Sequence, residues 1–170
     1  MNRPEINEFA PYYNNYISLV EGDDVMQVLN AQVAEIRSIF ANVPEDKGTT
    51  AYVEGKWTIK ELLSHLIDGE RIFAYRILRI SRGDKTPIEG FEQDDYIENS
   101  NANSRAFADL IGEFEAQRQS NLHMVNNISD EASKRMGTAS DKPVSVRALT
   151  YIMAGHVRHH MNVLNERYLV

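Results

Sequence analysis

The chain has 170 residues, of which 42% are apolar and 25% charged. This length fits one globular domain, and the apolar content excludes a disordered chain. The formal charge of −7 and the lack of a dense Lys/Arg run argue against nucleic acid or an anionic membrane as a partner. Because the chain has no Cys, disulfides and Cys-ligated metal sites are excluded, so a tight metal site must use His, Asp or Glu.

The amino-terminal segment has no apolar stretch typical of a secretory signal, and no run is long enough to span a membrane. We therefore expect a cytoplasmic protein. The sequence predicts one helical domain over residues 1–170. Residues 1–22, which contain three tyrosines, are expected to form a short helix or arm that packs on the outside.

Apolar residues recur at three- and four-residue steps in four long segments, the pattern of amphipathic helices. These segments span about 24–42, 58–83, 104–128 and 145–164. Asp23 or Asp24 caps the first helix, and Thr58 with Glu61 forms a capping box at the start of the second, which Gly83 ends. With no strands expected between them, these helices bury their apolar faces best against one another. The sequence predicts an all-α four-helix bundle.

Two connections, 83–103 and 129–143, are longer than a tight turn between antiparallel helices requires. Both are rich in polar residues, Gly and Pro. We expect them to be loops that can cap a site at one end of the bundle.

Two histidines, His156 and His160, lie four residues apart on the last predicted helix, so their rings share one face and can bind one cation. Both fall within the apolar stripe. Burying each ring without a partner costs about 1–3 kcal/mol, so the position calls for a partner. A metal ion is one partner, and a carbonyl, carboxylate or water is the alternative.

A catalytic type of metal site needs a third ligand, and His65 on the second helix is the best candidate. Gly69, one turn later, removes bulk and lets a helix or ligand approach the imidazole. The alternative is a boundary histidine with one hydrogen bond. His159 points elsewhere, and His123 lies on the outer face of its helix. Three imidazoles would leave a coordination position open, as in sites that activate water or a thiol.

The segments Trp57–Asp68 (WTIKELLSHLID) and Gly155–His160 (GHVRHH) together resemble the DinB/YfiT-like family of metal-binding proteins. The resemblance covers about residue 51 to the carboxyl end. It implies a four-helix bundle, often a homodimer, with a divalent metal on the positions of His65, His156 and His160. Imidazole ligands suit zinc, nickel, copper or iron, and of these we expect zinc or nickel. Relatives of this kind include metal-dependent transferases that use a low-molecular-weight thiol, and proteins described as hydrolases.

Two charged residues are candidates for catalysis. Asp68, three residues after His65, could orient an imidazole or act as a base, and the alternative is a plain surface charge. Arg118 falls on the apolar stripe of the third helix, so its guanidinium must pair with a buried carboxylate or reach an anionic substrate. Trp57 and Tyr96 could line the mouth of the site or pack within loops.

The histidine pattern predicts a metal-dependent enzyme that acts on a small molecule, and the resemblance implies thiol-transferase-like or hydrolase-like chemistry. A non-protein thiol is compatible with the lack of Cys. Two alternatives stay open: a non-catalytic metal- or ligand-binding bundle of the stress response, and a dimerising helical domain whose buried histidines bind no metal.

Overall fold

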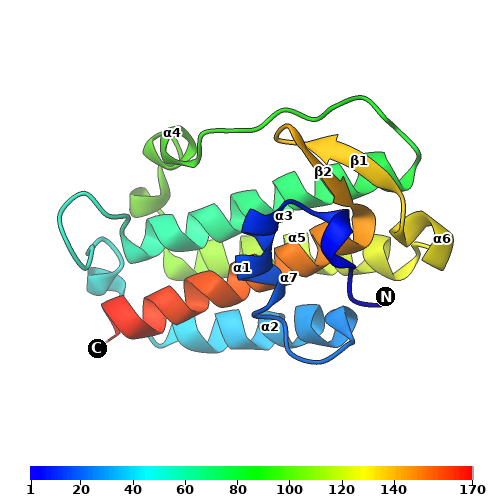
Figure 1. Cartoon of the computed structure of the whole chain (residues 1–170). Helices are drawn as coiled ribbons and strands as arrows, with labels where there is room; N and C mark the ends of the chain where they lie inside the picture. Colours follow the sequence, from blue (N-terminus) through cyan, green and yellow to red (C-terminus); the bar gives the residue numbers. More distant parts are fainter. Residues whose placement is uncertain (170) are drawn as a thin grey trace.

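The computed structural model describes residues 1–169 and is built around four long helices (Figure 1). These helices are α2 (Val25–Ala41), α3 (Ile59–Ser81), α5 (Phe107–Asn126) and α7 (Val146–Val163). Both α2 and α3 pack against α5 and α7, so the four close into a bundle. The predicted four-helix bundle is confirmed. None of the helices within residues 1–169 has the length and apolar character needed to cross a membrane.

Local signals set the ends of the long helices. Asp24 accepts hydrogen bonds from the first amides of α2, and Thr58 and Glu61 form the predicted capping box of α3. Gly83, just after α3, has a φ of 84°, a conformation that glycine adopts at no steric cost. Ser145 caps α7 by accepting from the amide of Ala148. The helix α5 begins at Phe107, three residues later than expected.

Shorter elements lie in the amino-terminal arm, in the connections between the long helices and after α7. They are η1 (Ile6–Glu8), η2 (Pro11–Tyr13), α1 (Asn14–Ile17), η3 (Glu45–Lys47), α4 (Gln93–Glu98), η4 (Ala102–Ser104), α6 (Asp130–Ser133), β1 (Met136–Ala139), β2 (Lys142–Ser145) and η5 (Leu164–Tyr168).

The expectation of strand-free connections is wrong for one segment. β1 and β2 pair antiparallel as a hairpin, with Ser140 and Asp141 at positive φ in the turn. The hairpin also forms bridges to Ile88, in the α3–α4 connection, and to Phe9, in the arm. Two four-residue strands are too short to give a clear period of two in the sequence, and these distant contacts hold them in place.

The amino-terminal arm is more deeply embedded than expected. Ile17 and Val20 are buried in the main core, and α1 lies against α7 (Figure 1). Gly155 makes this contact possible, because a Cβ there would lie 2.0 Å from the carbonyl oxygen of Tyr16. The arm is part of the folded core rather than an external attachment.

We therefore expect Gly155→Ala to force the arm away from α7 and to reduce the free energy of unfolding by about 1–3 kcal/mol. Denaturant unfolding and proteolysis of the arm measure the two effects. Gly112→Ala is the matched control, because Gly112 is also inside a long helix but has open space around its Cβ position. This control should be neutral or stabilising. Equal stability of both variants would contradict the proposed contact.

Candidate metal centre

Three histidines from two helices converge inside the bundle. His65 comes from α3, and His156 and His160 come from α7. One ring nitrogen from each lies within 4.8 Å of the other two. The Nε2 atoms of His65 and His156 are 2.8 Å apart. The structure thus brings together the three residues that the sequence analysis selected as ligands.

Helix geometry and a missing side chain allow this arrangement. The spacing of His156 and His160 places their ring centroids 4.6 Å apart on one face of α7. On α3, Gly69 leaves the space that the His156 ring fills, because a Cβ there would lie 3.1 Å from Cε1 of His156. Gly69 therefore admits an imidazole from the neighbouring helix, as its position suggested.

The environment keeps the rings uncharged. His65 and His156 are 4% and 7% exposed. Burial lowers the pKa of His65 to about 4 and that of His160 to about 3, and it lowers the pKa of His156 well below its usual value. Repulsion from neighbouring rings also lowers the pKa of His156 and of His160. For His65, the Asp94 carboxylate raises the pKa and His159 lowers it, both less strongly than burial does. Neutral imidazoles present the lone pairs that a metal ion requires.

The geometry is also compatible with the alternative that needs no metal. At 2.8 Å, one neutral ring can donate an N–H to the other, which satisfies one nitrogen of His65 and one of His156. Within residues 1–169, His160 forms no such ring-to-ring hydrogen bond with His65 or His156. A purely structural pair therefore leaves the third ring unexplained.

Two cavities reach the histidines. The first, of about 300 Å³, is lined by His65 and His156. The second, of about 310 Å³, is lined by His160, His159 and Trp57. The Trp57 ring lies 4.6 Å from that of His65, so Trp57 lines the mouth of the site, one of the two roles considered for it. The site is buried but accessible to a small molecule.

Arg118 is completely buried, and each of its three guanidinium nitrogens donates at least one hydrogen bond. Its Nε and Nη2 donate to both carboxylate oxygens of Glu70, at 2.8 and 2.6 Å. Its Nη1 donates to the Leu29 carbonyl and to Gln32 Oε1, both at 2.9 Å. The side chain has no exposed surface, so it cannot contact a substrate. This is the buried pairing that the sequence analysis offered as the alternative to catalysis.

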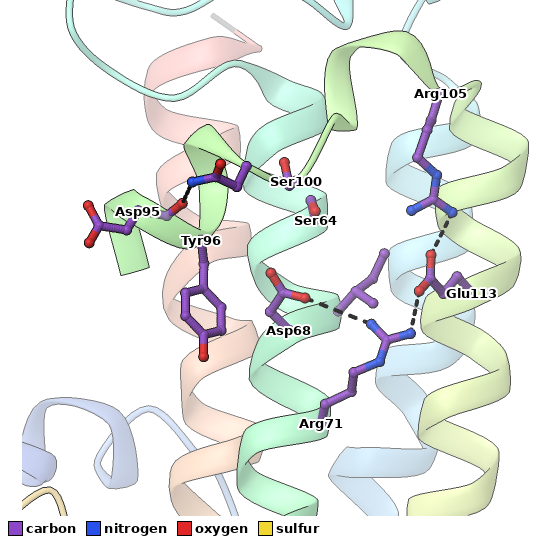
Figure 2. Close-up of a pocket in the computed structure, with 10 residues that line it drawn as sticks. Ser64, Asp68, Arg71, Asp95, Tyr96, Ser100, Arg105 and Glu113 are labelled. Carbon is purple, nitrogen blue, oxygen red and sulfur yellow. Dashed lines mark hydrogen bonds and ion pairs between the residues drawn. The ribbon is translucent and has the colours of Figure 1, made fainter. Parts of the chain in front are cut away.

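Asp68 lines another cavity, of about 550 Å³, which lies between α3, α4 and α5 (Figure 2). Its carboxylate lies 3.8 Å from Arg71, which also pairs with Glu113. Burial raises the pKa of Asp68. No hydrogen bond joins it to an imidazole within the described chain. Tyr96 lines this cavity too and is absent from the residues that line the two cavities at the histidines.

Glu70, the partner of Arg118, was not among the residues predicted from the sequence. A signal for it exists, because Glu70 occupies the apolar stripe of α3, four residues after Leu66 and seven before Ile77. An acidic residue on the apolar stripe of one helix and a basic residue on the apolar stripe of another, here Glu70 and Arg118, indicate a buried ion pair. Asn121 and Gln32, which complete the hydrogen bonding, carry no comparable signal.

Residues 28–164 match the family model of the DinB superfamily. The chain belongs to this superfamily. It is similar to the solved structure of YfiT from Bacillus subtilis, described as a probable metal-dependent hydrolase with an unusual four-helix bundle topology. The TM-score is 0.78 at 14% identity, over 90% of this chain and 95% of that one.

A second similar structure is the mycothiol-dependent maleylpyruvate isomerase, with a TM-score of 0.66 at 14% identity, over 81% of this chain and 58% of that one. A mutant of the same isomerase gives a TM-score of 0.65. At this identity, the matches show that the DinB-superfamily fold is shared. No curated protein sequence matches the chain.

The lowered histidine pKa values predict a pH dependence of stability for the metal-free protein. Below pH 6.5 the unfolded chain binds protons that the folded rings do not, so stability falls as the pH drops from about 6.5 toward 4. A fully buried histidine contributes up to about 1.4 kcal/mol per pH unit in this window. Urea unfolding at several pH values, in the presence of a chelator, measures the slope. His65→Gln should reduce it, and an unchanged slope would contradict the prediction.

The buried pair predicts a large loss of stability when one partner is removed. Arg118→Met leaves Glu70 buried without its cation, which should reduce the free energy of unfolding by about 3–5 kcal/mol. Adding Glu70→Met should recover part of this loss. Arg37→Met, which breaks the exposed pair with Glu115, is the control and should change stability little. Denaturant unfolding measures all four proteins, and equal effects of the two single variants would refute this assignment.

Proposed function

We propose that this DinB-superfamily protein is a metal-dependent enzyme acting on a small molecule, with His65, His156 and His160 as ligands of a divalent metal ion. The observation that carries the proposal is the convergence of three neutral imidazoles at a buried point that two cavities reach. The description of YfiT as a probable metal-dependent hydrolase and of the isomerase as mycothiol-dependent supports the same class of activity.

The donor set fits such an ion. Three histidine nitrogens suit zinc or nickel better than the hard cations that prefer oxygen ligands. Within residues 1–169, the group of candidate ligands contains these three residues and no fourth, so a side would remain open to a substrate. Bound there, the ion would supply Lewis acidity that lowers the pKa of a coordinated thiol or water.

Residues of the second cavity are suited to handle the proton that an activated nucleophile releases. Asp94 and His159 both line it, beside His160 and Trp57. The indole of Trp57 donates to Asp94 Oδ1 at 3.1 Å and holds this carboxylate at the cavity. We therefore assign the proton-accepting role to Asp94 or His159. Asp68, which the sequence suggested, lines a different cavity and contacts Arg71.

The nucleophile is proposed to be a low-molecular-weight thiol or water. A thiol must come from outside the protein because the chain has no Cys. We also propose, on the family resemblance, that the protein works as a cytoplasmic homodimer. Light scattering after size-exclusion chromatography tests the dimer.

Metal content tests the ligand set directly. Untagged protein incubated with zinc or nickel and then desalted should retain about one equivalent of metal per chain, measured by elemental analysis. His160→Ala should reduce the affinity at least tenfold, because removing one of three ligands leaves a weak two-nitrogen site. His123→Ala, on the exposed face of α5, should bind like the wild type.

Activity separates the enzyme from a non-catalytic binding protein. Metal-loaded protein would be assayed with bacillithiol or glutathione plus haloalkane, epoxide and ester substrates. Turnover that disappears with a chelator and in His160→Ala supports the enzyme. Metal binding without any turnover supports the non-catalytic bundle, and less than a tenth of an equivalent of metal leaves only the hydrogen-bonded histidines.

A further inference from the structure

The first cavity extends away from the histidines along α3. It is lined by His65, Gly69, Phe73 and Arg76, which recur on one face of this helix. Gly69 and Arg76 are two turns apart, or about 10 Å along the helix axis. The cavity therefore has the histidines at one end and a guanidinium at the other.

Arg76 differs from the other buried arginines. Arg118 and Arg147 are each paired with a carboxylate, of Glu70 and Glu8 respectively. Arg76 is only 4% exposed, yet no carboxylate lies within ion-pair distance of it in the part of the chain that the structure describes. A buried cation without a counter-ion is costly, and burial lowers the pKa of Arg76.

The hydrogen bonds of Arg76 are also incomplete. Nη2 donates to Ser140 Oγ at 2.8 Å and to the Glu89 carbonyl at 3.2 Å. Nε is buried and has no acceptor within residues 1–169. Ser140 lies in the hairpin turn and Glu89 in the α3–α4 connection, so these two segments hold the guanidinium against the cavity. The free donor calls for an acceptor that the protein does not provide.

The walls between the two ends are mostly aromatic. Tyr13 and Tyr16 contribute from the arm, Phe73 from α3 and Phe91 from the α3–α4 connection. Flat apolar walls and a volume of about 300 Å³ suit a small planar molecule rather than a peptide or a sugar chain. Glu92 also lines the cavity, but its side chain is exposed.

We propose that this cavity binds a small aromatic carboxylic acid, with its carboxylate on Arg76 and its other end at His65 and His156. The proposal deepens the proposed function, since it names the substrate class that would be presented to the histidines. An acid is favoured because a carboxylate supplies both the missing charge and the missing acceptor. The overall charge of −7 offers no general attraction for an anion, so a dedicated cation is required.

The test uses metal-free protein in a chelator, so that a carboxylate cannot bind through a metal. Phenylacetate and its uncharged analogue phenylacetamide are titrated against ¹⁵N-labelled protein by NMR, with the Nε–H signals of arginine as the probe. We expect saturable binding of phenylacetate that shifts the Arg76 signal. The amide should bind at least tenfold more weakly. This comparison uses the wild-type chain alone and does not depend on a variant that folds.

Variants then localise the site. Arg76→Gln should weaken phenylacetate binding at least tenfold, and Arg82→Gln, at an exposed arginine after the same helix, should change it less than twofold. The titrations use metal-free protein, so their outcome does not depend on whether the histidines bind a metal. The metal site can therefore fail its own test while the carboxylate site passes, and the reverse also holds.

Three results would overturn the proposal. One is equal affinity for phenylacetate and phenylacetamide. Another is unchanged phenylacetate binding in a folded Arg76→Gln variant. The last is no saturable binding of phenylacetate or of 3-phenylpropionate at tens of millimolar, which would identify Arg76 as a clamp between α3 and the hairpin only.

Discussion

The buried ion pair of Arg118 and Glu70 is the interaction on which the bundle and the histidine cluster both depend. Arg118, on α5, binds Glu70 on α3 and two acceptors on α2. Asn121 donates to the same carboxylate at 2.9 Å. Gln32 donates to the carbonyl of Ala154 on α7 at 2.8 Å, which brings the fourth helix into the network. One set of hydrogen bonds thus joins all four long helices.

This network also sets the register of the helices that carry the histidines. Glu70 is five residues after His65 on α3, and Ala154 is two residues before His156 on α7. Apolar packing alone tolerates sliding and repacking, because dispersion contacts are not directional. Buried, directional hydrogen bonds do not tolerate sliding of one helix against another, since such a shift would leave a buried charge without its partner. We infer that the polar network fixes the spacing across which the imidazoles meet.

Much of this fold could be predicted from the sequence, because its main determinants are local. The capping box at Thr58, the cap at Asp24 and the i,i+4 spacing of His156 and His160 all act within a few residues. Each of these is a feature that one helix can specify by itself. The convergence of His65 with the pair joins two helices, and its prediction rested on the position of His65 beside an apolar stripe and on the family resemblance.

The remaining features depend on contacts between distant segments, and they could not be predicted. The hairpin is held by bridges to Phe9 and Ile88, and its turn supplies Ser140 to Arg76. The docking of the arm depends on the absence of a side chain at Gly155. The sequence shows the glycine but does not indicate which segment packs against it. Arg76 reads as an ordinary helix residue until the structure shows the acceptors around it.

The two glycines beside His156 explain how these local and distant parts form one site. Gly69 admits the His156 ring to α3, and Gly155, adjacent in sequence, admits the arm with Tyr16, whose ring lies 5.7 Å from that of His156. The bundle therefore supplies the imidazoles, while the arm, the α3–α4 connection and the hairpin supply much of the first cavity wall. Connections tolerate substitution and movement better than a packed core does. Changes in these segments can alter what the cavity binds while the helices that hold the histidines stay in place.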